Sequence, residues 1–487
     1  MISHGPAESS KTTTTRHLDG LRGLAATIVF IQHNLSNFTW GLHEFGFGQS
    51  GQHYYFVSLP FIRIFFNGGG AAVVIFFILS GYVLSVSHLR KLKSWSPSTS
   101  SNDIRTWRWS LLSAVVRRPV RLYLPPLVIA FMVALMIHIP GPVFVPTPIL
   151  KPHEGGIGAE LVQFIVKSAH FFQPFQVHSN SVFSWYTYDM AIWTIPIELK
   201  GSILIFGLLG LFSLFGLRGA GPIRAAVIAA TMIVIGGIML SLSFKWSMAC
   251  FLFGMAIAIV DIWDLDGRFF RALPSEHIRT VVLHILFFAG WYLLSEPAHD
   301  GNPFTTYQTP GWKWLSTFIP KGYNQENYYR YWHSFGGLPF VYGALRISWL
   351  RWLLSRKPIL FLGEVSFMLY LVHLPLGDVF GVRINALFGG PVSEHLKDTF
   401  WDGSLAVPDI GPFGLSTRPL LCLSLSLAIY LFYAYYATEW IDKPAVRLSR
   451  KLAVKLRLQT DRAVLAQEPL LPMATVDSMQ PIGRSAA

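Results

Sequence analysis

Residues 16–33 read RHLDGLRGLAATIVFIQH and open the first long apolar stretch of the chain. At about 100° and roughly 1.5 Å per residue, Arg22 and His33 fall on nearly the same face of a helix, about 16 Å apart along its axis. Ionisable side chains are costly within a membrane helix and by default indicate a functional site. The stretch therefore predicts a membrane helix that carries an arginine near one surface of the bilayer and a histidine deep inside it.

The composition of the whole chain is typical of an integral membrane protein. Apolar residues make up 52% of its 487 residues and charged residues only 13%, and apolar runs long enough to cross a bilayer recur along the sequence. We expect an all-α, polytopic, multi-pass membrane protein with about ten transmembrane helices, which excludes a soluble enzyme. The expected spans are residues 18–38, 68–87, 120–139, 191–217, 222–242, 246–263, 278–294, 335–354, 358–379 and 418–440.

Lysine and arginine are concentrated in alternate loops between these spans. Because cytoplasmic loops retain basic residues, the distribution predicts that both termini are cytoplasmic. We attribute the net charge of +13 to this topological bias and to attraction for anionic membrane lipids, and we expect no nucleic-acid partner. Residues 157–172 mix Glu160 and Lys167 with apolar residues, which predicts an amphipathic helix at the membrane interface.

The chain consists of three segments that differ in polarity and charge. Residues 1–17 are polar, residues 18–444 form the transmembrane domain, and residues 445–487 are first basic and then polar, which predicts a cytoplasmic tail that ends in disorder. Cys250 and Cys422 both fall within expected spans, so neither a disulfide framework nor a cysteine metal cluster is expected. The histidines are otherwise scattered, and we expect no metal site.

Six short motifs follow one another through the transmembrane domain, and together they resemble the acyltransferase 3 family of integral-membrane O-acyltransferases. The resemblance implies an acyl-CoA co-substrate, usually acetyl-CoA, and acylation of a hydroxyl group on a sugar, a lipid or a small natural product. The arginine and histidine that the family ties to activity correspond to Arg22 and His33. The motifs are LDGLRGL (18–24), FFILSGY (76–82), RRPVRLYLP (117–125), WTIPIE (193–198), LGEVSFMLYLVH (362–373) and EWIDKP (439–444).

Three ionisable residues are expected to share one depth in the outer half of the membrane. His33 and His373 each lie about fifteen residues from the cytoplasmic end of their spans, and Glu198 lies about seven residues from the outer end of its own. Histidine suits proton removal from a hydroxyl at neutral pH, so we expect His33 to be the general base. Glu198 would orient His33 or stabilise its charged form, and His373 would be a second base or an oxyanion donor.

A second group of ionisable residues is expected near the cytoplasmic surface. Arginine forks bind phosphate well, so these side chains would hold the phosphates of acyl-CoA while its thioester arm extends inward toward His33. The group consists of Arg22, Arg117, Arg118, Arg121, Arg356 and Lys357, and the first four are the expected donor-binding residues.

Other interpretations of these residues remain open. Arg22 would pair with Asp19, His33 would bridge two helices, or Glu198 would pair with Lys200, each in a purely structural role. Buried Arg, Glu and His side chains also suit a transporter or flippase, although no internal repeat is evident. A catalytically silent scaffold is a third reading. The chain carries no added soluble domain, which favours a small or lipophilic acceptor, such as a terpenoid or polyketide, over a carbohydrate or cell-surface glycan.

Overall fold

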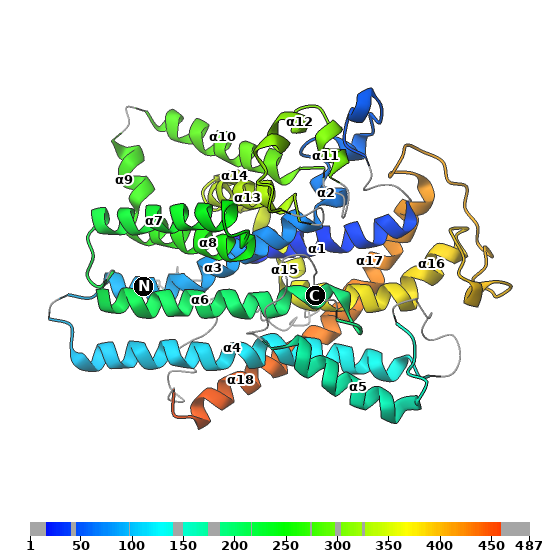
Figure 1. Ribbon diagram of the computed structural model, residues 1–487, viewed down its shortest axis with the longest axis horizontal. Helices are drawn as coiled ribbons and strands as arrows, with labels where there is room; N and C mark the ends of the chain where they lie inside the picture. The colour runs from blue at the N-terminus through cyan, green and yellow to red at the C-terminus, as the bar shows by residue number, and fades with distance from the viewer. Residues whose placement is uncertain are drawn as a thin grey trace, which may run out of the picture.

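The computed structural model describes residues 16–39, 45–96, 98–139, 150–173, 186–215, 217–272, 275–297, 303–323 and 327–458. Within these ranges the chain forms helices and no strand, which confirms the all-α class. Figure 1 shows long helices, α3, α4, α6, α7 and α8 among them, running side by side along the longest axis of the molecule. The polar segment 1–17 lies mostly outside the described residues, and so does the end of the expected tail, 459–487.

In the described part of the chain, eight helical segments are long and apolar enough to cross a membrane. This number supports a polytopic membrane protein, and each of the eight overlaps one of the expected spans. Each segment contains one long α-helix. These helices are α3 (Gly69–Lys93), α4 (Ser101–Met136), α6 (Thr194–Phe215), α7 (Pro222–Ser241), α8 (Trp246–Trp263), α10 (Glu276–Leu294), α15 (Lys357–Leu376) and α17 (Thr417–Ala437).

Two expected spans, the first (18–38) and the eighth (335–354), are not among these eight segments. The first is a continuous 23-residue helix, α1 (Arg16–Phe38), which packs against α3 and α15 in the interior of the molecule. The eighth is not one helix: α13 (Arg330–Ala344) and α14 (Ser348–Leu354) are separated at Ile347, whose backbone is extended. Arg346, just before the break, forms ion pairs with Asp261 and Asp266. The prediction of a single helix over 335–354 was therefore wrong, because the extended backbone at Ile347 interrupts it.

Helix α4 is much longer than the expected span of residues 120–139. Its 36 residues correspond to about 54 Å, whereas the hydrocarbon core of a bilayer is about 30 Å thick. The helix starts at a true N-cap, where the Ser100 hydroxyl accepts a hydrogen bond from the Asp103 N–H at 3.1 Å. The N-terminal part of α4 therefore projects beyond the apolar layer, which is why hydropathy did not detect it.

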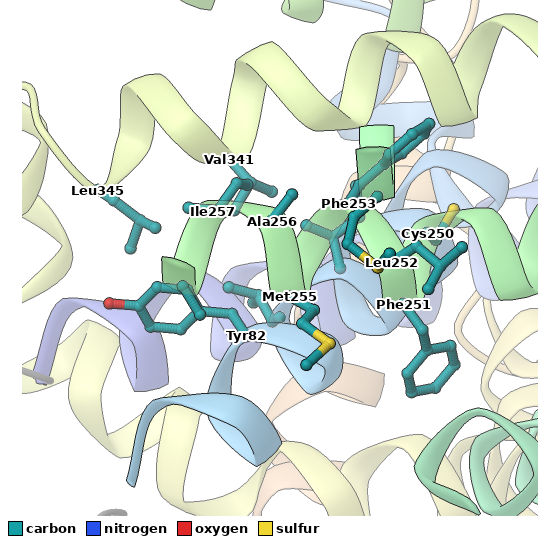
Figure 2. Packing of buried hydrophobic residues seen from close by; sticks show 14 of the residues in the cluster. Tyr82, Cys250, Phe251, Leu252, Phe253, Met255, Ala256, Ile257, Val341 and Leu345 are labelled. Carbon is teal, nitrogen blue, oxygen red and sulfur yellow. The ribbon is translucent and has the colours of Figure 1, made fainter. Parts of the chain in front are cut away.

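Helix pairs pack at very short backbone distances where glycines face each other. A Cβ on Gly254 of α8 would lie 2.0 Å from the Ile78 carbonyl oxygen of α3, and one on Gly23 of α1 would lie 2.4 Å from the Gly363 nitrogen of α15. Figure 2 shows the apolar side chains of α8 packed between α3 and α13. Small residues of this kind let membrane helices approach closely. They allow α1 and α15 to pack directly against each other.

Both C-terminal spans continue through a π-turn into a further helix. After α15, the turn Gly377–Gly381 leads to α16 (Val382–Leu387); after α17, the turn Thr438–Asp442 leads to α18 (Lys443–Lys455). Helix α18 packs against α4. The basic first part of the expected tail is thus a helix attached to the bundle.

The amphipathic segment forms a separate helix, α5 (Gly156–Phe171), which is not among the eight candidate spans. Its buried Glu160 accepts hydrogen bonds from the Tyr188 hydroxyl at 2.5 Å, from the His153 N–H at 2.8 Å and from His138 at 3.1 Å. Burial raises the pKa of this carboxyl, but the three hydrogen bonds outweigh burial and leave the pKa below its usual value. Through Tyr188, α5 fixes the segment that enters α6.

Candidate functional site

The structure brings His33 and His373 together. His33 lies on α1 and His373 near the C-terminal end of α15, and the centres of their rings are 5.1 Å apart. The two helices pack along one another, so Arg22 and His33 mark two depths of one interface, about 16 Å apart. We refer to His33 and His373 as the histidine pair.

The hydrogen bonding of His373 defines which of its nitrogens is a base. Nδ1 lies 2.7 Å from the Tyr370 carbonyl oxygen, which can only accept, so Nδ1 carries the proton. Nε2 then keeps its lone pair; it is buried and has no hydrogen-bond partner among the described residues. Such an arrangement leaves a basic nitrogen ready for a proton from a bound ligand.

Tyr370 connects the histidine pair to the start of α6. Its hydroxyl donates to the Ala191 carbonyl oxygen at 2.5 Å and lies 3.0 Å from the Thr194 hydroxyl. Ala191 belongs to a 3-10 turn, Met190–Trp193, that is capped by the Asp189 carboxylate at 2.9 Å from the Ala191 N–H. Tyr370, three residues before His373 on α15, therefore links this helix to the start of α6.

Glu198 forms an ion pair with an arginine of α4. It accepts a short hydrogen bond from the guanidinium of Arg118 on α4, which also donates to the Ser202 hydroxyl at 2.8 Å. A largely buried arginine needs a counter-charge, and the Glu198 carboxylate supplies it in the arginine group. The ion pair that the structure shows for Glu198 is thus with Arg118 and not with Lys200, and a role of Glu198 in orienting His33 stays a prediction.

The ion pair between Arg118 and Glu198 can be tested by measuring the stability of variants that lack one or both charges. Arg118→Gln should destabilise the protein by about 3 kcal/mol, because it leaves the Glu198 carboxylate without its partner in a poorly hydrated site. The double variant Arg118→Gln/Glu198→Gln should recover most of that loss, since both charges are removed. Thermal unfolding of the purified protein in detergent measures both; a double variant less stable than either single one would refute the pairing.

The expected donor-binding arginines are contributed by two helices: Arg22 lies on α1, and Arg117, Arg118 and Arg121 lie on α4. Arg22 interacts electrostatically with Arg118, Arg121 and Asp442 of the second π-turn. Arg117 donates from Nε to the Ser113 carbonyl oxygen at 3.3 Å. The group also gains a member from α18 that the sequence did not indicate: Arg450 interacts with Arg117 and Arg121.

Positive charge exceeds negative charge in this group, which we call the arginine cluster. Its five cations are Arg22, Arg117, Arg118, Arg121 and Arg450, whereas the carboxylates that interact with them are those of Asp19, Glu198 and Asp442. Excess cations in a poorly hydrated region are stabilised by a bound anion with several charges. Within the described ranges no group of three or more His, Cys, Asp or Glu side chains is placed to hold a metal ion.

Arg330 is a further buried cation, in a segment for which no functional role was predicted. Its guanidinium lies 4.6 Å from the ring of Trp246, 4.7 Å from that of Tyr329 and 5.3 Å from that of Trp193, and it donates to the Gly70 carbonyl oxygen at 3.0 Å. Cation–π contacts of this kind are strengthened by exclusion of water. Arg330 thereby holds Trp193, the last residue of the turn that Tyr370 contacts.

Fold and site define a polytopic all-α membrane protein with ionisable groups at two depths between its helices. Residues 16–437 match the family described as an acyltransferase domain. The chain therefore belongs to the acyltransferase 3 family and is an acyltransferase, as the six motifs indicated.

Two curated fungal proteins are similar to the chain over most of its length. O-acetyltransferase PaAT-1 of Phomopsis amygdali is 28% identical over 500 residues, which cover 94% of this chain and 88% of the relative. Acyltransferase clz18 of Cochliobolus lunatus is 22% identical over 431 residues, which cover 78% of this chain and 86% of the relative. No solved structure matches the chain.

Proposed function

We propose that the chain transfers an acyl group, the acetyl group in particular, from acyl-CoA to a hydroxyl of a small or lipophilic acceptor such as a terpenoid or a polyketide. The observation that carries this proposal is the histidine pair, whose rings are 5.1 Å apart. His33 of this pair shares helix α1 with Arg22 of the arginine cluster, which lies at another depth. The family assignment and the similarity to a protein named O-acetyltransferase support the reaction type.

The arginine cluster is the proposed site for the phosphates of the donor. Arginine binds phosphate oxygens through two parallel N–H bonds, and the cluster has more cations than carboxylates to neutralise them. The distance of about 16 Å along α1 between Arg22 and His33 suits the narrow arm that links the phosphates of coenzyme A to its thioester. Acyl-CoA would thus bind as a co-substrate, with no other bound cofactor in the proposal.

The histidine pair is the proposed site of proton transfer. The acceptor oxygen attacks the thioester carbonyl, the new C–O bond forms and the C–S bond breaks, and the hydroxyl proton moves through an imidazole to the departing sulfur. We assign the general base to His33, as the sequence predicts, because it is less buried than His373 and a hydroxyl compound reaches it more easily. Nε2 of His373, with its lone pair, is placed to share the proton.

Apolar side chains surround the histidine pair and favour a lipophilic acceptor. Phe76 lies with its ring centre 6.2 Å from that of Tyr370, and Phe30 lies 5.2 Å from Tyr430. These rings belong to one buried cluster contributed by α1, α3, α15 and α17. These apolar rings would contact an acceptor that dissolves in the membrane.

The reaction is tested by metabolite mass spectrometry. Cells expressing the wild-type chain or His33→Ala are fed isotope-labelled acetate, and hydroxyl compounds are searched for a gained acetyl mass. Labelled esters that form with the wild type alone are the expected result and also identify the acceptor. If the membranes contain equal amounts of both proteins and both give the same products, the proposal fails; solute flux in vesicles without acyl-CoA would then support the transporter reading.

A further inference from the structure

A groove separate from the proposed active site lies where α4 begins. It has a volume of about 540 Å³ and is lined by the first three turns of α4 together with Arg218, which follows α6. Figure 1 shows the start of α4 and the connection from α6 to α7 at the same end of the molecule. None of the six family motifs includes a residue of this groove.

Three guanidinium groups line the groove. Arg105 and Arg108 are one turn apart on α4, and Arg218 faces them from the connection between α6 and α7. All three are exposed, and none forms an ion pair with a carboxylate in the described part of the chain. The nearby Asp103 accepts from the Ser100 hydroxyl at 2.9 Å, which holds it at the start of the helix.

Apolar side chains form another part of the same groove. Trp109 and Leu112 are 43% and 44% exposed although both are large and hydrophobic. The groove therefore offers cations to an anion and an apolar wall to a hydrocarbon chain. A ligand that matches both parts carries an anionic head and an apolar tail.

The length of α4 places the groove at the headgroup level of a bilayer. Residues 101–112 extend over about 18 Å, and the rest of α4 is long enough for the apolar core. Tryptophan is enriched at this level, as Trp109 exemplifies. The predicted orientation assigns this face to the cytoplasm, where anionic lipids attract juxtamembrane basic residues.

We propose that the groove binds the headgroup phosphate of an anionic phospholipid, whose acyl chains lie along Trp109 and Leu112. This site is distinct from the arginine cluster, because Arg108 and Arg118 are about 15 Å apart along α4 and Arg118 bonds to α6. The inference does not depend on the proposed reaction.

The test measures lipid retained by the purified full-length protein. Protein in mixed micelles that contain equal amounts of phosphatidylinositol and phosphatidylcholine is washed, and bound lipid is quantified by mass spectrometry. The wild type should retain roughly tenfold more of the anionic lipid. The variant Arg105→Gln/Arg108→Gln/Arg218→Gln should lose this preference, whereas the same three positions changed to lysine should keep most of it.

A matched control removes three exposed arginines from the same face outside the groove, as Arg224→Gln/Arg268→Gln/Arg279→Gln. Equal losses in the two glutamine variants would show that net charge alone attracts the lipid, and would overturn the proposal. A second experiment adds acetyl-CoA to the lipid-bound protein. If acetyl-CoA displaces the lipid from the wild type and binds the groove variant more weakly, the groove holds coenzyme A phosphates and the lipid proposal is overturned. If the groove variant binds acetyl-CoA as the wild type does, the result supports a lipid site.

Discussion

His373→Ala should reduce the rate of acyl transfer by a factor of about 10² to 10⁴, the range that a positioned acid or base contributes. The wild-type imidazole donates from Nδ1 to the Tyr370 carbonyl oxygen and keeps a lone pair on a buried Nε2 beside His33. Alanine removes this lone pair. The rate is measured as ester formed per minute by purified protein in nanodiscs.

The control for this variant is His284→Ala. His284 lies on α10, where its Nδ1 bonds to the Thr280 carbonyl oxygen on its own helix, away from both the histidine pair and the arginine cluster. The control should keep the wild-type rate. A His373→Ala protein that elutes as a single species and works as fast as His284→Ala would exclude His373 from the reaction.

Gly254→Leu should prevent the correct packing of α8 against α3. Even a single Cβ at this position would lie 2.0 Å from the Ile78 carbonyl oxygen and 2.7 Å from the Tyr82 nitrogen. Backbone atoms cannot move aside as a flexible side chain can, so the two helices must separate and lose the contacts of the buried core. We expect a loss of most of the folded protein, measured as the monodisperse fraction in size-exclusion chromatography and as the midpoint of thermal unfolding.

Gly237→Leu provides the matched comparison. Gly237 lies on the neighbouring helix α7, and a Cβ there would meet nothing within 4 Å. The same side chain is therefore added to a membrane helix without a clash, and stability should stay close to that of the wild type. Equal stability of the two variants would show that the close contact between α3 and α8 is not needed for folding.

Periodic patterns and motifs predicted the parts of the fold that depend on one segment at a time. Apolar runs gave most spans, and the spacing from Arg22 to His33 placed the two residues on one helix. The depth count from each membrane surface placed His33 and His373 at a common level, and their rings lie 5.1 Å apart. Such features follow from helix geometry and hydropathy alone.

The features that the sequence did not predict depend on contacts between segments. Glu198 forms an ion pair with Arg118 because a charge in a poorly hydrated site needs a partner. Counting residues from the membrane surface gives the depth of Glu198 but not this partner. Arg450 joins the arginine cluster through a helix that composition alone assigned to a tail. The basic, amphipathic pattern after the EWIDKP motif was the available signal for that helix, and its attachment to α4 is a tertiary contact.

The most direct test of the account measures acyl transfer itself. Purified wild-type protein and His33→Ala in nanodiscs are each given isotope-labelled acetyl-CoA and a panel of terpenoid and polyketide alcohols, and both labelled ester and free coenzyme A are quantified. We predict that ester and free coenzyme A appear in equal amounts with the wild type, and that both are lost with His33→Ala. Equal ester formation by a folded His33→Ala protein would contradict it.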